Sequence, residues 1–133
     1  MEHTAKYLNG LTDQIIGAAV AVHRALGPGL LESAYEACPY HELVKRGLSV
    51  ERQKPLPLVY DGVRLDCSYR MDLVVANCVI VEVKAVAKID RVHEAQMLSY
   101  LKLADLRVGL ILNFNVRNLT HPGVLRLVNN FPG

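Results

Sequence analysis

VIVEVK, residues 79–84, is a short apolar run that carries two charges at alternate positions. Side chains alternate between the two faces of a β-strand, so the three valines share one face. Ile80, Glu82 and Lys84 share the other face. A carboxylate and an ammonium at the end of a buried strand are costly unless they have a partner or a purpose. The run therefore predicts a central strand whose far end is functional.

A second apolar segment, residues 71–75, precedes this strand and carries Asp72. In an antiparallel pair, directly opposed residues share a face, and a slip of one residue exchanges the faces. A two-residue loop between the segments would place Asp72 and Glu82 on opposite faces of the sheet. A three-residue connection over 76–78 pairs Val75 with Val79 and opposes the two acids. We predict the three-residue connection, because only that register lets both acids share one site.

Hydrophobic periodicity and turn residues predict the other elements. Thr12 is the expected N-cap of the first helix, and Pro39 is expected to kink or break the second. The predicted order is a helix over 12–26, a helix over 30–46, irregular extended chain over 48–59, a strand over 63–75, a strand over 78–84, a helix over 92–104, a strand over 108–113 and a short helix over 123–128. This order predicts a layered α/β domain with a mixed central sheet of about four strands flanked by helices.

Length and composition narrow the class of protein. The chain has 133 residues, a formal charge of +2 and 51% hydrophobic residues, enough for one core. We expect a flexible segment over 1–10 and a single domain over 11–133. No apolar run approaches the roughly 20 residues that span a bilayer, and the start of the chain lacks the pattern of a signal peptide. We therefore expect no membrane partner. Three cysteines without metal-ligand spacing indicate reduced thiols in a cytoplasmic protein.

The charged residues around the central strand suit phosphodiester cleavage. That reaction needs an activated water and neutralisation of charge on the phosphoryl oxygens, and Mg²⁺ supplies both when carboxylates and waters hold it. Asp72 and Glu82 supply carboxylates, and the carbonyl of Val83 is a further oxygen donor. Lys84 is placed to orient the attacking water, and Glu32 to reach the metal through water. The alternatives are a solvated Glu82–Lys84 pair and, for Glu32, a first-turn acid favoured by the helix dipole.

The helix that follows the central strand adds polar residues on one face. His93, Gln96 and Tyr100 share that face by helical spacing. We predict that Gln96 and Tyr100 face the E-x-K strand rather than solvent. His93 either touches a phosphate or is an exposed residue at the helix start. Arg70 shares the strand face of Asp72 and is either a phosphate clamp or a salt-bridge partner.

These motifs together resemble the PD-(D/E)XK nuclease superfamily, in the branch with Q-x-x-x-Y after E-x-K. The chain also looks like the small bacterial proteins of the GxxExxxxY family, a likeness carried by GPGLLESAYE, ERQKPLPLVYDGVRLDCSYRMDLVV, VIVEVKAV, HEAQMLSYLKL and GLILNFNV. The resemblance implies a restriction-endonuclease-like core. It also implies a catalytic set of Glu32, Asp72, Glu82, Lys84, Gln96 and Tyr100.

The expected function is a Mg²⁺-dependent nuclease, with Mn²⁺ as an alternative ion, acting on DNA or RNA. The other hypothesis is a catalytically inactive nucleic-acid-binding or protein-interaction module with the same fold. A domain of this size contacts little DNA alone, which favours a homodimer. The sequence departs from the family name, since Ala37 stands at its tyrosine position, although Tyr35 and Tyr40 are close.

Overall fold

The computed structural model describes residues 3–133, and the expectation of flexibility for residues 1–2 lies outside this range. A five-stranded sheet forms the centre of the protein, with the strand order β1-β4-β5-β6-β7. Its strands are β1 (Val50–Pro55), β4 (Arg70–Val75), β5 (Val79–Lys84), β6 (Val108–Asn113) and β7 (Val124–Val128). The β5–β6 pair is parallel and the other neighbouring pairs are antiparallel, so the sheet is mixed as predicted.

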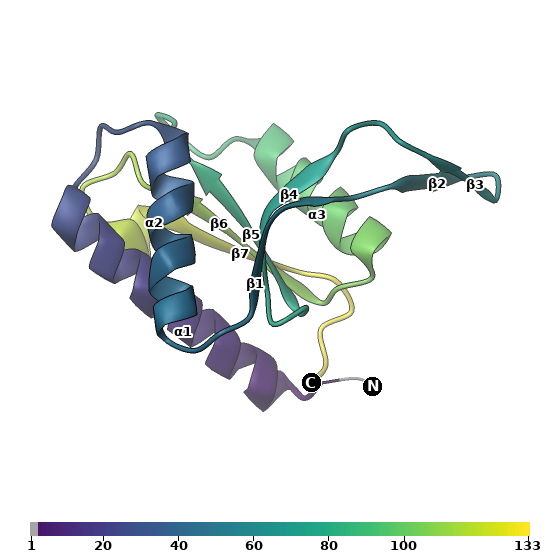
Figure 1. Cartoon of the computed structure of the whole chain (residues 1–133), viewed down its shortest axis with the longest axis horizontal. Helices are drawn as coiled ribbons and strands as arrows, with labels where there is room; N and C mark the ends of the chain where they lie inside the picture. Colours follow the sequence, from purple (N-terminus) through teal and green to yellow (C-terminus); the bar gives the residue numbers. More distant parts are fainter. Residues whose placement is uncertain (1–2) are drawn as a thin grey trace.

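Helices cover both faces of the sheet. The helices α1 (Ala5–Leu26) and α2 (Glu32–Lys45) lie on one side, and α3 (Arg91–Ala104) lies on the other (Figure 1). The valines of β5 pack into the larger core beneath α1 and α2, as the alternation of VIVEVK requires. Ile80 packs into a second core with Met97 and Leu101 of α3. Glu82 and Lys84 belong to the same strand face as Ile80, and so to the side of the sheet that α3 covers. No helix within residues 3–133 has the length and apolar character needed to cross a membrane.

The first helix begins at Ala5, seven residues before the position predicted from Thr12. Thr4 is the N-cap, and its hydroxyl accepts a hydrogen bond from the Tyr7 amide at 3.1 Å. Thr12 instead lies inside the helix and donates to the carbonyl of Asn9. Residues 5–10 are therefore helical, because Leu8 extends the buried stripe of the helix by a further turn.

The second helix runs without a break through Pro39, contrary to one of the two outcomes predicted there. Proline removes one backbone hydrogen bond and costs roughly 3 kcal/mol inside a helix. Tyr35 and Leu43, one turn to either side, are completely buried in the core. Their packing, together with the burial of Pro39 itself, outweighs this penalty.

The single strand predicted over 63–75 is divided into the short strand β3 (Val63–Leu65) and the sheet strand β4. The short strands β2 (Leu58–Tyr60) and β3 (Val63–Leu65) form a separate hairpin, which projects from the ends of β1 and β4 as an arm (Figure 1). A tight turn with positive φ angles at Asp61 and Gly62 joins the two strands of this hairpin. A side chain–backbone turn, in which Asp66 accepts from the amide of Ser68, interrupts the chain between β3 and β4.

The last element is also a strand where a short helix was predicted. Val124–Val128 forms β7, which pairs with β6 from Leu112↔Val124 to Val108↔Val128. Leu125 and Leu127 alternate onto the α3 side and pack there. β7 raises the number of strands from about four to five, since it occupies the edge that β6 would otherwise expose.

Tyr35 fixes the loop that leads into α2. Its ring stacks on Phe114, with centroids 4.6 Å apart, and its hydroxyl accepts from the Leu30 amide at 3.1 Å and donates to the Gly27 carbonyl. We expect Tyr35→Phe to lower the free energy of unfolding by about 1–2 kcal/mol, because the stack remains while two hydrogen bonds are lost. Urea denaturation measures this loss. Tyr60→Phe on the exposed arm is the control, and equal stability of the two variants would contradict the assignment.

Candidate active site

The β4–β5 connection has the predicted register. Val75 pairs with Val79, and Leu73 with Val81, so residues 76–78 form a three-residue connection. Ala76 and Asn77 both have positive φ, as in the tight turns that suit β-hairpins. The regular pairing ends at Leu73↔Val81, one position before Asp72 and Glu82. The prediction of the odd connection is confirmed, and the two acids are brought together where the ladder ends.

The carboxylates of Asp72 and Glu82 take over the hydrogen bonding beyond the ladder. The Asp72 amide donates to Glu82 Oε2 at 2.7 Å, and the Val83 amide donates to Asp72 Oδ2 at 2.9 Å. Each acid is therefore anchored by the backbone of the opposite strand. Because one oxygen of each carboxylate is held in this way, the second oxygen of each is free of main-chain bonds and available to a ligand.

Burial and neighbouring negative charges raise the pKa of both acids. Burial raises the pKa of Glu82 to about 8, and the neighbouring Asp72 charge adds to this effect. The pKa of Asp72 is also raised, first by burial and then by the charges of Glu36 and Glu32. The Lys84 ammonium and the backbone hydrogen bonds act in the opposite direction on both groups. A half-buried and a buried carboxylate that repel each other favour a bound proton or a bound cation.

Lys84 and Val83 complete the end of β5. Lys84 is half-buried and pairs in register with Asn113 of the parallel strand β6. Its positive charge lowers the pKa of both acids. The Val83 amide points toward Asp72. In a β-strand the N–H and C=O of one residue point to the same edge, so the Val83 carbonyl is directed into the same gap.

Glu32 lies at the first position of α2, where the helix dipole stabilises an anion. Its Oε2 accepts from the Ala85 amide, at 3.4 Å, just beyond the end of β5. Its charge also raises the pKa of Asp72. The structure therefore places Glu32 beside the other acids, while its role as a first-turn acid applies as well.

Tyr100 faces the acids, and Gln96 is bonded to it. The Gln96 amide donates to the Tyr100 hydroxyl at 3.1 Å. Tyr100 is buried in the core under α3, and burial followed by the Glu82 charge raises its pKa. Tyr100 therefore lies on the face of α3 that packs against the sheet, and Gln96 is joined to it by a hydrogen bond.

Glu36 and Gln53 also belong to this site, and sequence reasoning missed both. Glu36 is buried one helical turn after Glu32, and its charge raises the pKa of Asp72 and Glu82. The Gln53 amide donates to Glu36 Oε1 and, at 3.4 Å, to Asp72 Oδ1. The i, i+4 spacing of the two glutamates was a usable signal for Glu36. The sequence contained no such signal for Gln53, because its place opposite Asp72 depends on the β1–β4 register.

The remaining candidates have structural roles or stay exposed. His93 Nδ1 accepts from the Asp90 amide at 2.9 Å, which completes a capping box at the start of α3. Arg70 is exposed and makes no salt bridge within residues 3–133. Phe114, which follows β6, is completely buried and so does not offer its ring to a base.

Within residues 3–133, no group of three or more His, Cys, Asp and Glu side chains is arranged to hold a metal ion. Mg²⁺ proteins commonly supply only one or two carboxylates and leave the other positions to water and substrate. The oxygen donors of Asp72, Glu82 and Val83 suit such a hard cation. These three residues therefore fit a Mg²⁺ or Mn²⁺ ion whose remaining coordination positions are filled by waters and substrate.

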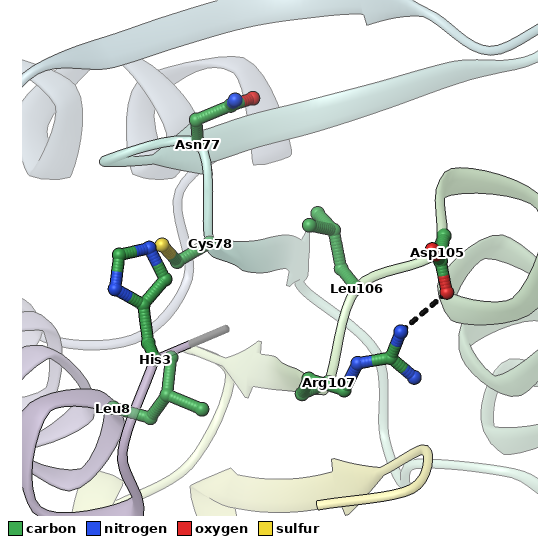
Figure 2. Close-up of a pocket in the computed structure, with 7 residues that line it drawn as sticks. All are labelled: His3, Leu8, Asn77, Cys78, Asp105, Leu106 and Arg107. Atoms are coloured by element: carbon green, nitrogen blue, oxygen red, sulfur yellow. Dashed lines mark hydrogen bonds and ion pairs between the residues drawn. The ribbon is translucent and has the colours of Figure 1, made fainter. Parts of the chain in front are cut away.

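One cavity of the structure lies away from this site. It encloses about 300 Å³ at the start of β5 and is lined by His3, Leu8, Asn77, Cys78, Asp105, Leu106 and Arg107 (Figure 2). Cys78 precedes β5, whereas Glu82 and Lys84 lie at its far end. Arg107 is paired with Asp105 in this cavity. None of the acids of the candidate site lines it.

A mixed sheet between helices, with one acid on β4 and an acid and a lysine at the end of the neighbouring strand β5, defines a restriction-endonuclease-like domain. The sequence model of the PD-(D/E)XK nuclease superfamily matches residues 9–127. The chain therefore belongs to this superfamily, and the predicted fold class is confirmed. No curated protein and no solved structure matches the chain.

Proposed function

We propose that the protein is a divalent-metal-dependent nuclease that hydrolyses phosphodiester bonds in DNA or RNA. The observation that carries this proposal is the pair of hydrogen bonds by which Asp72 and Glu82 each bind the opposite strand where the β4–β5 ladder ends. This arrangement holds two repelling carboxylates together beside Lys84. Membership of a nuclease superfamily supports the same activity.

Each residue has a proposed role. Asp72, Glu82 and the Val83 carbonyl hold the cation, which is Mg²⁺ or Mn²⁺, and Glu32 contacts it through water. When bound, the cation supplies an activated water and neutralises charge on the phosphate. Lys84 orients the attacking water and stabilises its deprotonated form. Gln96 and Tyr100 complete the catalytic set on the α3 side.

The test is cleavage of labelled DNA and RNA, single- and double-stranded, by the wild-type protein with Mg²⁺, Mn²⁺ or a chelator. Glu82→Ala serves as the inactive reference. We expect metal-dependent cleavage by the wild type alone. A protein that binds nucleic acid but cleaves none of these substrates with either metal would support the second hypothesis, an inactive binding module.

Tyr100→Phe is expected to slow cleavage about tenfold and to leave Mn²⁺ affinity unchanged. The Tyr100 oxygen accepts from Gln96, so its own proton is free to donate toward the acids or a phosphate. Loss of an outer-sphere hydrogen bond typically costs 10–100-fold in activity or affinity. Single-turnover rates and calorimetric Mn²⁺ titration measure the two quantities. Cleavage at the wild-type rate would show that the hydroxyl has no part in the reaction.

The wider assignments are also proposals. We propose a single domain over 11–133, a cytoplasmic location and a bacterial origin within the GxxExxxxY family, with a homodimer as the assembly on nucleic acid. The superfamily match over residues 9–127 supports the domain. Free thiols at Cys38, Cys67 and Cys78 suit a reducing compartment.

A further inference from the structure

Gln53 occupies an unusual backbone position in β1. Its neighbours pair with β4 as Arg52↔Leu73 and Lys54↔Met71, so Gln53 stands opposite Asp72 without a regular pairing. Its φ angle is 50°, in the left-handed region that residues other than glycine rarely adopt. Such strain persists only where surrounding contacts impose it, and it is concentrated at functional sites.

The amide of Gln53 joins two acids from different elements. Its Nε2 donates to Glu36 Oε1 of α2 and to Asp72 Oδ1 of β4, the latter at 3.4 Å. Both partners are carboxylates, which only accept hydrogen bonds, so the NH₂ end of the amide must face them. The orientation of the Gln53 side chain is therefore fixed by its surroundings.

Glu36 is itself a rigid anchor. Its side chain is buried, and Arg52 Nη2 lies 3.3 Å from its Oε2. Arg52 therefore holds one oxygen of Glu36 and Gln53 holds the other. A flexible amide attached to such an anchor loses much of its freedom, so its second hydrogen atom is presented to Asp72 in a constant direction.

We infer that Gln53 is a positioning residue that orients the Asp72 carboxylate for a divalent cation. Asp72 Oδ2 is held by the Val83 amide and Oδ1 by the Gln53 amide, so the carboxylate plane is fixed from both sides. Each oxygen retains a lone pair for a ligand. This inference rests on the proposed function, because it assigns a partner to one of the proposed metal ligands.

A merely structural role for Gln53 predicts a different response to substitution. The residue is exposed, so its removal leaves no cavity in the core. Gln53→Gly deletes the amide and also relieves the left-handed strain, because glycine adopts positive φ freely. Gln53→Gly should therefore gain stability from the relieved strain and lose the contact that orients Asp72. These opposite effects separate a positioning role from a structural one.

The test compares the full-length wild type, Gln53→Gly, Gln53→Glu and the control Glu51→Gln by calorimetric titration with Mn²⁺, thermal melting and single-turnover cleavage. Glu51 lies in the same strand and forms a salt bridge with Lys54. We expect Gln53→Gly to melt at or above the wild-type temperature and to bind Mn²⁺ 10–100-fold more weakly. Gln53→Glu cannot donate to Asp72 as a carboxylate and should also bind Mn²⁺ with altered affinity, whereas the control should match the wild type.

The outcomes separate this inference from the proposed function. Wild-type affinity for Mn²⁺ in both Gln53 variants would overturn the positioning role and leave the metal site intact. A melting temperature of Gln53→Gly well below that of the wild type, with unchanged Mn²⁺ affinity, would assign Gln53 to structure alone. A wild-type protein that binds no Mn²⁺ would overturn the proposed metal site, and with it this inference.

Discussion

Glu82→Gln is expected to abolish metal binding and cleavage and yet to stabilise the protein at alkaline pH. The variant keeps an oxygen that can accept from the Asp72 amide, as Glu82 Oε2 does at 2.7 Å. It removes a buried negative charge that Asp72 repels. A neutral amide is a poor ligand for a divalent cation compared with a carboxylate. This one substitution should therefore increase the stability of the fold at alkaline pH and abolish metal binding at the site.

The pH dependence gives this prediction a definite sign. The pKa of Glu82 rises from an ordinary value of 4.5 to about 8 in the folded protein. The folded state therefore holds a proton more tightly than the unfolded chain. The resulting stabilisation is complete below the unfolded pKa and is lost as the pH rises through the folded one. Glu82→Gln does not titrate, so it escapes this loss.

Urea unfolding of the metal-free proteins at pH 5 and pH 9 measures the difference. We expect the free energy of unfolding of Glu82→Gln, relative to that of the wild type, to increase by roughly 2–4 kcal/mol from pH 5 to pH 9, since one pKa unit corresponds to about 1.4 kcal/mol. Saturating Mg²⁺ should reduce the gap by stabilising only the wild type. Glu51→Gln, at an exposed position of β1, is the control. A gap that does not depend on pH would show that Glu82 is not held in an unfavourable charged state.

Lys84→Ala is expected to lower the cleavage rate by about 10²–10³-fold and to retain metal binding. That loss is typical when one electrostatic stabiliser of a transition state is removed. Metal affinity should stay the same or increase, because the ammonium lowers the negative potential at the two carboxylates and opposes a second cation. Single-turnover cleavage and Mn²⁺ titration test the two parts separately.

A purely structural Lys84 would give the reverse pattern. If the ammonium only neutralised Glu82, its loss would mainly lower stability by leaving a buried carboxylate uncompensated. Melting temperature therefore decides between the two roles together with the rate. A folded, metal-binding Lys84→Ala protein that cleaves as fast as the wild type would exclude the catalytic role.

The centre of the site could be predicted because its residues follow one another along adjacent strands. The alternation of residues 79–84 placed Glu82 and Lys84 on one face, and the length of one turn fixed Asp72 on that face as well. Helical spacing did the same for Gln96 and Tyr100. These inferences needed only local geometry.

Features that depend on the tertiary structure could not be predicted in this way. The burial of Leu8 decides where α1 begins, and the packing of Tyr35 and Leu43 keeps α2 intact at Pro39. The exposed edge of β6 makes residues 124–128 a strand. Gln53 enters the site through the register of β1 on β4, which no local pattern indicates.

The arm formed by β2 and β3 leaves the sheet between two strands that are already neighbours. Leu56 still bonds to Tyr69, and beyond that rung the hairpin makes no pairing with the main sheet. Loop-closure entropy depends weakly on length, so longer or shorter arms cost the fold little. Gln53 and Asp72 lie a short distance inside its base. The arm can thus be replaced, in evolution or by design, without a change in the sheet that holds the acids. Such a replacement would alter which molecules can approach the acids.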